Sequence, residues 1–340
     1  MRCRTPGFTV CCGATGGRRD ADERRNSRFS QILSLRQAQD TAASICPTSV
    51  VRVQFFRAKQ TVMLPVTDPS LQQRLAAHQA ERDVWLAETL VQLESDERVD
   101  AAWLFGSLGR DDADELSDID LFVIVNDAEF DGLIAQRYDF LAQIAQPLLV
   151  LEAPQNWPPG GVYNMALYPG AFGPHQVDWY WVRRSAAELP AETRLLFDRI
   201  DLPRQDSPTY FDYAPVPERT AEEEATQNVN GFWVMWLIAC KYIARYPWKA
   251  NLGVMRLVPH HLRQIAAFVD APLPLPEIEP LHPSPAEKIA RLRELASLAE
   301  PLLPAVVAKG GAIPTQIVPY AHRYLALVEA IAYNSDRPTT

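Results

Sequence analysis

A glycine–serine pair and two nearby carboxylates carry the clearest chemical signal in this chain. Gly106 and Ser107 follow a short apolar run, and Asp118 and Asp120 open the apolar segment 118–125. Side chains in a strand alternate between its two faces, so the two carboxylates should point the same way, roughly 7 Å apart. Such carboxylates can share divalent cations, and a Gly-Ser turn that leads into a helix can offer backbone N–H groups to a phosphate. The pattern predicts metal-dependent nucleotidyl transfer.

A long helix should precede these residues. Asp68 followed by Pro69 is a typical helix start, because the aspartate can cap the first turn and the proline fits inside it. We expect this helix to end at about Glu97. Its expected buried positions are Leu71, Leu75, His78, Val84, Leu86, Leu90 and Leu93.

Short apolar runs between turns and helices predict a small mixed β-sheet. Beyond its carboxylates, the segment 118–125 is apolar on both faces, as a central strand covered on both sides should be. We expect helices to begin near Ser107 and to span about 128–145. The expected strands lie at about 101–105, 118–125, 148–152, 162–167 and 176–182. The fold class is therefore α/β in the broad sense, of α+β type, with helices packed behind the sheet.

Beyond a linker at 206–217, nearly every segment has helical spacing. The expected helices span about 220–246, 248–268, 285–303 and 314–333. Apolar residues recur on one face of the first helix at Phe232, Trp236, Ala239 and Ile243, and on the third at Ile289, Leu292, Ala296 and Ala299. We therefore predict a nucleotidyltransferase domain over 63–213 and a C-terminal helical bundle domain over 214–340.

Residues 1–62 differ from the rest in composition and charge. They carry 11 Lys and Arg against 4 Asp and Glu, hold four of the five cysteines, and show little periodicity. Two interpretations are open: a disordered extension, or a segment upstream of a natural start at Met63. The segment has no secretory apolar region, and its glycines at 13–17 lack the lysine of a phosphate-binding loop. We leave it out of the fold prediction.

Residues 63–340 are strongly acidic, with 22 Lys and Arg against 38 Asp and Glu and a net charge of −16. Enzymes that act on nucleic acids usually need a basic face, so small cationic substrates or proteins suit this charge better. Only Cys240 lies here and no C-x-x-C pair occurs, which argues against a disulfide scaffold or a structural zinc site and for a cytoplasmic location. No apolar run is long enough to span a membrane.

The core motif runs from Leu104-Phe105-Gly106-Ser107-x-x-Arg110 through Ser117-Asp118-Ile119-Asp120-Leu121, and it resembles the DNA polymerase β-like nucleotidyltransferase superfamily. A small sheet domain followed by a helical bundle is similar in layout to the adenylyltransferases that modify aminoglycoside or lincosamide antibiotics and so confer antibiotic resistance. The resemblance implies ATP as co-substrate, two Mg²⁺ ions and a small hydroxylated, cationic acceptor. It does not imply a particular antibiotic, nucleotide preference or oligomeric state.

The resemblance also implies roles for individual residues. Asp118, Asp120 and a third carboxylate, Asp178, would bind the metal ions, and Asp178 could act instead as the general base. Contacts to the nucleotide phosphates would come from Gly106, Ser107, Arg110 and Lys241.

Several of these residues have structural interpretations as well. Arg110 could pair with Asp111 or Asp114, and Lys241 shares a helix face with Arg245, as many exposed pairs do. The run Glu222, Glu223 and Glu224 competes with Asp178 as the base, although acidic clusters are common at helix N-termini. Aromatic residues at regular spacing are more often core than cleft, which applies to Trp179, Trp181, Trp233 and Trp236.

Two other functions stay open alongside the small-molecule transferase. The chain could nucleotidylate a protein acceptor, whereas its acidic character disfavours RNA. It could also be a non-catalytic nucleotide-binding or antitoxin-like module, but such a module has no need to keep a set of metal ligands.

Overall fold

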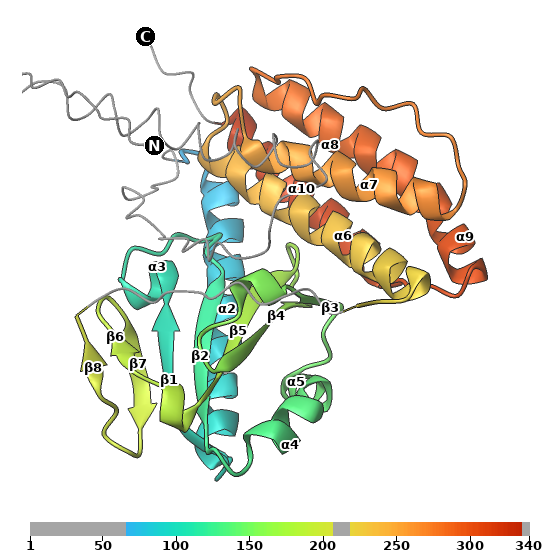
Figure 1. The fold of residues 1–340 in the computed structure, drawn as a ribbon. Helices are drawn as coiled ribbons and strands as arrows, with labels where there is room; N and C mark the ends of the chain where they lie inside the picture. Colours follow the sequence, from blue (N-terminus) through green and yellow to red (C-terminus); the bar gives the residue numbers. More distant parts are fainter. Residues whose placement is uncertain (1–65, 207–217, 335–340) are drawn as a thin grey trace, which may run out of the picture. The chain divides into compact units, whose positions relative to one another are not determined.

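The computed structural model describes residues 66–206 and 218–334, and all of them fall within one compact unit of the chain. The expected extension 1–62 and the expected domain boundary at 213/214 lie outside the described residues. Among those residues, six strands form a mixed sheet in the order β3-β4-β5-β2-β1-β7 (Figure 1). The strands are β1 (Val99–Phe105), β2 (Ile119–Val125), β3 (Leu149–Glu152), β4 (Gly161–Tyr168), β5 (His175–Arg183) and β7 (Arg194–Asp198).

The pairing of β2 with β5 places two segments that are distant in sequence side by side. These strands are parallel, whereas β1 is antiparallel to both β2 and β7, and β4 is antiparallel to both β3 and β5. In the parallel pair, Asp120 lies opposite Asp178. The predicted mixed sheet is therefore confirmed, and its centre carries two of the predicted site residues.

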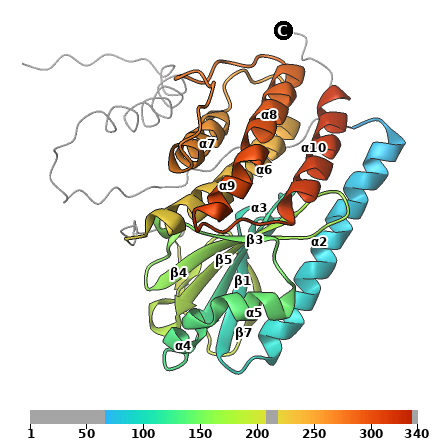
Figure 2. The same cartoon turned by 90° about the vertical axis from the view of Figure 1, so that its right-hand side faces the viewer.

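Helices cover one face of the sheet. Helix α2 (Pro69–Ser95) begins as expected, since Asp68 accepts a hydrogen bond of 2.9 Å from the backbone N–H of Ser70. Together with α4 (Phe130–Ala135) and α5 (Arg137–Ile144), it buries the odd-numbered side of the central strands (Figure 2). This core contains Leu86, Leu93, Phe130, Leu133, Phe140, Leu121, Val123, Trp179 and Trp181.

The opposite face belongs to a second core that continues into the C-terminal helices. Rings of Trp103, Phe122 and Tyr180 stack across three neighbouring strands, with centroids 5.1 and 4.4 Å apart. The helices are α6 (Ala221–Arg245), α7 (Leu257–Phe268), α8 (Pro285–Ala299), α9 (Leu303–Ala308) and α10 (Ile317–Tyr333). Both predicted helix stripes are buried here, and Trp236 of α6 donates a hydrogen bond of 2.9 Å to the carbonyl of Leu292 in α8.

Some expected elements differ from the observed ones. The helix predicted over 128–145 is divided at Gln136, where Arg137 turns back to donate to the carbonyl of Ile134 and to pair with Glu152. The helix predicted from 248 begins only at Leu257, after the short 3₁₀ turn Gly253–Arg256, because glycine at 253 disfavours a continuous helix. In α2 the buried stripe includes Arg82 and Thr89, while Val84 is exposed, contrary to expectation.

Among the described residues, the sheet region contains three short strands besides the predicted ones. Strand β7 was not expected, and the two-residue strands β6 (Leu189–Pro190) and β8 (Arg204–Gln205) form a small separate pair. No helix of the described ranges combines the length and the apolar character needed to cross a bilayer.

Candidate active site

Three carboxylates meet where β2 and β5 begin. Asp118 immediately precedes β2, Asp120 is its second residue, and Asp178 lies opposite Asp120 on β5. Neighbouring strands lie about 4.8 Å apart, and residues two apart on a strand share a face. The sheet therefore directs all three carboxylates to the same side, as the sequence predicts for the first two.

Gly106 forms the floor of this cluster. Its φ angle is +64°, a region that residues with a Cβ rarely adopt. A Cβ built at Gly106 would lie 2.1 Å from Oδ2 of Asp120. The turn between β1 and the short helix α3 (Gly106–Gly109) thus needs glycine twice, for its backbone conformation and for the space that the Asp120 carboxylate occupies.

The buried carboxylates of the cluster repel one another and therefore favour a bound cation. Burial, followed by the neighbouring carboxylates Asp118 and Asp178, raises the pKa of Asp120 well above its usual value. Burial and the charge of Asp118 raise the pKa of Asp178 to about 7, although a hydrogen bond of 3.0 Å from Gln176 opposes this. Because like charges are crowded together out of water, a cation among them would lower the free energy of the ionised state.

Lys241 supplies one positive charge from the helical half of the chain. Its Nζ lies 2.6 Å from Oδ2 of Asp118, and the lysine is 7% exposed. Burial alone would raise the pKa of Asp118, but the attraction and hydrogen bond of Lys241 outweigh it, so the net shift is downward. The helix α6 therefore completes the carboxylate cluster, and Asp118 is ionised at neutral pH.

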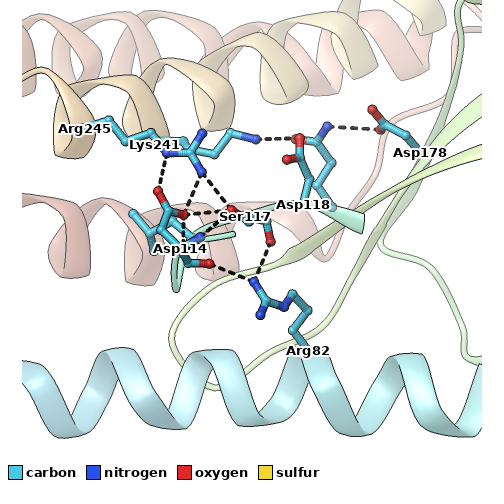
Figure 3. A network of polar contacts seen from close by, with 9 residues as sticks. Arg82, Asp114, Ser117, Asp118, Asp178, Lys241 and Arg245 are labelled. Carbon is cyan, nitrogen blue, oxygen red and sulfur yellow. Dashed lines mark hydrogen bonds and ion pairs between the residues drawn. The ribbon is translucent and has the colours of Figure 1, made fainter. Parts of the chain in front are cut away.

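A second set of contacts fixes the loop that delivers Asp118, as Figure 3 shows. Arg245, one turn after Lys241, binds both carboxylate oxygens of Asp114 at 2.7 Å and also donates to Oγ of Ser117. From the opposite side, Arg82 of α2 donates to the backbone carbonyls of Asp114 and Ser117. The two arginines clamp residues 114–117 between α2 and α6.

This clamp was not foreseen from the sequence. Helical spacing placed Arg245 on the same helix face as Lys241 but did not indicate its partner, which is Asp114. One signal was available, because Arg82 stands four residues from both His78 and Leu86 in the buried stripe of α2. A charged residue in such a stripe must find polar partners.

The remaining predicted phosphate contacts lie close to the cluster. Ser107 follows Gly106 at the start of α3, and its carbonyl accepts a hydrogen bond from the N–H of Asp112. Arg110 ends that turn and pairs with Asp112 at 3.1 Å. The alternative prediction that Arg110 pairs with Asp111 or Asp114 is therefore wrong. Asp111 pairs instead with Arg194, and Asp114 is bound by Arg245.

The competing acidic run lies elsewhere. Glu222, Glu223 and Glu224 form the first turn of α6, where Glu223 and Thr220 make a reciprocal capping box. At 1.5 Å per residue, Glu223 is about 27 Å along the helix from Lys241. The structure does not bring this run together with the carboxylate cluster. Likewise, Trp179, Trp181, Trp233 and Trp236 are fully buried core residues, as expected.

A small cavity of about 30 Å³ borders the cluster, lined in part by Asp118, Gln176, Lys241 and Tyr324. This space accommodates a water molecule or an ion. The donor set of three carboxylates is the oxygen-only set that Mg²⁺ prefers. The residues therefore fit a magnesium site with Asp118, Asp120 and Asp178 as its ligands.

The comparisons with known proteins agree with this geometry. The family model described as "Polymerase beta, Nucleotidyltransferase" matches residues 88–152. The matched range contains Gly106, Ser107, Arg110, Asp118 and Asp120, and ends before β5. No curated protein is significantly similar to the chain. The match supports a nucleotidyltransferase domain of the DNA polymerase β-like superfamily, and hence nucleotidyl transfer from a nucleoside triphosphate.

Proposed function

We propose that this chain is a Mg²⁺-dependent adenylyltransferase that transfers AMP from ATP to a hydroxyl group of a small molecule, an aminoglycoside-like antibiotic. One observation carries the proposal. Asp118, Asp120 and Asp178 converge beside the left-handed Gly106 turn, and two of the three lie inside the matched nucleotidyltransferase residues.

Each residue of the cluster has a role in this proposal. Asp118 and Asp120 would hold the metal, with Asp178 either as a third ligand or as the general base. The bound metal would neutralise phosphate charge and lower the pKa of the attacking hydroxyl. Gly106 and Ser107 bind the phosphates through backbone N–H groups and the serine hydroxyl. In the transfer, the acceptor oxygen forms a bond to the α-phosphorus while the bond to pyrophosphate breaks.

Asp178 is the best candidate to accept the hydroxyl proton. A general base works best when its pKa lies near the working pH, and in the metal-free chain the pKa of Asp178 is raised to about 7. Lys241 is a candidate phosphate ligand, because its ammonium group lies next to Asp118 and is flexible enough to change partner.

The acidic character of the chain supports a cationic acceptor. Residues 63–340 carry a net charge of −16, and fields of this sign raise the local concentration of polyamines. The same field disfavours a nucleic-acid acceptor, whose phosphates would be repelled.

The test is pyrophosphate release by the full-length chain with ATP and Mg²⁺, across aminoglycosides, lincosamides and neutral polyols. Release should depend on one class of acceptor. The double variant Asp118→Asn/Asp120→Asn should lose activity by more than about 100-fold, because electrostatic stabilisation of the transition state is lost. Asp131→Asn, an exposed aspartate outside the site, is the matched control and should keep wild-type activity.

Other outcomes would redirect the proposal. If the double variant released pyrophosphate as fast as the wild type, the carboxylate cluster would have no role in the reaction. If no small acceptor supports release but α-labelled ATP labels a protein in a cell lysate, the acceptor is a protein. Binding of ATP without transfer to either kind of acceptor would indicate a nucleotide-binding module.

A further inference from the structure

Two histidines and a glutamate form a cluster beside the carboxylates, from different elements. His78 and Glu81 lie one turn apart on α2, and His175 is the first residue of β5. The two imidazole rings stack, with centroids 4.3 Å apart. One nitrogen from each ring and one carboxylate oxygen of Glu81 all lie within 4.8 Å of one another.

One pair of groups in the cluster has the spacing of two ligands of a single ion. Nε2 of His175 lies 3.3 Å from Oε2 of Glu81. Two ligands about 2.0–2.1 Å from a tetrahedral ion are separated by about 3.3 Å. A hydrogen bond between these two groups would use the same atoms but would leave His78 outside it, whereas an ion could bind all three.

A buried nitrogen of His78 without a hydrogen-bond partner also points to a ligand. The residue is only 4% exposed, and its Nδ1 has no hydrogen-bond partner among the described residues. Buried polar atoms without partners are uncommon in native proteins. Burial lowers the pKa of His78 to about 3 and, with the nearby Arg82, that of His175 to about 4. Both rings are therefore neutral at pH 7, which is the form that binds metals.

The surroundings hold the cluster open on one side. A Cβ at Gly170 would lie 2.7 Å from Nε2 of His175 and 3.0 Å from Oε2 of Glu81, so the loop before β5 leaves this space free of side chains. The N–H of Ala171 donates to the same Glu81 oxygen at 3.0 Å. The Glu81 side chain is 37% exposed and borders a surface hollow with His175, which gives an ion a way in.

We propose that His78, Glu81 and His175 bind a divalent transition-metal ion, with Zn²⁺ as the best match. These ligands differ from the three carboxylates, although His78 and His175 border the same small cavity as Asp118. Two imidazoles and one carboxylate are a common ligand set for Zn²⁺ and its neighbours, whereas Mg²⁺ prefers oxygen alone. The bound ion ties α2 to the start of β5, the strand that carries Asp178 three residues later. The sequence lacks the cysteine pairs of common structural zinc sites, but here histidine and glutamate ligands would let the ion brace the proposed active site.

The test measures metal binding by the full-length protein, stripped of metal with EDTA and kept in excess Mg²⁺ so that the carboxylate cluster is occupied. ZnCl₂ should raise the melting temperature, as any ligand of the folded state does. CoCl₂ should produce the visible absorption bands of a histidine-ligated ion. Glu81→Gln and His78→Gln should each weaken Zn²⁺ binding, measured by titration calorimetry, by at least about tenfold.

Two controls separate this site from other binding. Glu88→Gln changes a glutamate of α2 that borders the same hollow but lies outside the cluster, and it should bind Zn²⁺ as the wild type does. Asp118→Asn/Asp120→Asn should also keep Zn²⁺ binding, whatever it does to nucleotidyl transfer. Wild-type Zn²⁺ affinity in Glu81→Gln, or no binding by the wild type, would overturn the proposal. Glu81→Gln decides the matter even if His78→Gln fails to fold.

Discussion

At the scale of single residues, the site depends on one position that must have no side chain. Gly106 combines a φ of +64° with a carboxylate oxygen where a Cβ would stand. The surrounding turn cannot relax away, because Phe105 is paired with Asp120 across β1 and β2. Any side chain at this position must displace Asp120.

Gly106→Ala should therefore lower nucleotidyl transfer by about 100-fold or more, since shifts of about 1 Å at a reacting group have effects of this size. The left-handed conformation adds about 1–2 kcal/mol of destabilisation. Steady-state kinetics and urea unfolding measure the two effects. Gly132→Ala, at a helical glycine with no atoms near its missing Cβ, is the control. It should leave the activity unchanged and should not destabilise the protein, because alanine favours the helix more than glycine does. Normal activity in Gly106→Ala would contradict the assigned geometry.

A second prediction at this scale concerns pH. The pKa of an aspartate in an unfolded chain is about 3.9, whereas the pKa of Asp178 in the metal-free folded chain is raised to about 7. Between these values the folded state holds a proton that the unfolded state has lost, so this carboxyl group makes stability fall as pH rises.

Asp178→Asn removes that dependence. In EDTA, the free energy of unfolding of the variant should increase relative to the wild type as pH rises from about 4 to about 7, and the difference should then level off. The buried histidines titrate in both proteins, so their contribution to the pH dependence cancels in the difference. Urea unfolding at a series of pH values measures the difference, and a difference that is constant with pH would show that Asp178 titrates normally.

The residues themselves were only partly predictable. Gly106, Asp118 and Asp120 could be found because local spacing within one strand–turn–strand unit determines their geometry. Asp178 required a guess about strand pairing, since a lone Asp in a strand carries no local signal. The partners Asp114 and Arg245 were missed because their contact joins segments more than a hundred positions apart, which periodicity does not report.

At the scale of elements, the Arg245–Asp114 pair joins α6 to the loop before β2. Both side chains are largely buried, at 13% and 11% exposure. Burial opposes charge on Arg245, but the hydrogen bonds and charge of Asp114 more than compensate, and its pKa is raised. The pair thus holds the helical half of the chain against the strand that carries the carboxylates.

Arg245→Met should destabilise the protein by about 3–5 kcal/mol, because it leaves Asp114 buried and unpaired. Adding Asp114→Asn should restore part of that loss. Disruption of an exposed pair by Arg183→Met should cost no more than about 1 kcal/mol, since its partner Asp131 is 84% exposed. Urea unfolding compares the four proteins, and equal losses for the two arginine variants would argue against a clamp.

The elements were easiest to predict where caps and periodicity agree. Asp68 with Pro69 marked the start of α2 correctly, and the helix predicted from 285 begins there as α8. Strand β7 was missed, because an edge strand of partly exposed residues has neither the apolar run nor the alternation of a core strand. The break at Gln136 was also missed, because no proline or glycine lies there to indicate the end of a helix.

At the scale of the whole molecule, charge should govern how the acceptor arrives. The net charge of −16 over residues 63–340 attracts cations through a field that salt screens, with a Debye length of about 10 Å at 0.1 M. The KM of a cationic acceptor should therefore rise several-fold between about 50 and 500 mM NaCl. A neutral polyol should show little change in KM under the same conditions, and equal salt dependence for both would exclude electrostatic attraction.

The parallel pairing of Asp120 with Asp178 has a consequence for how the protein is made. Parallel strands need a long crossover, here the whole stretch from α4 to β4, so their contact is among the slowest to form during folding. The helices rely on local contacts and can form sooner. After dilution from denaturant, helical circular dichroism should therefore recover before the proposed Mg²⁺ binding does. The time course of that binding would then report when the carboxylates of β2 and β5 come together.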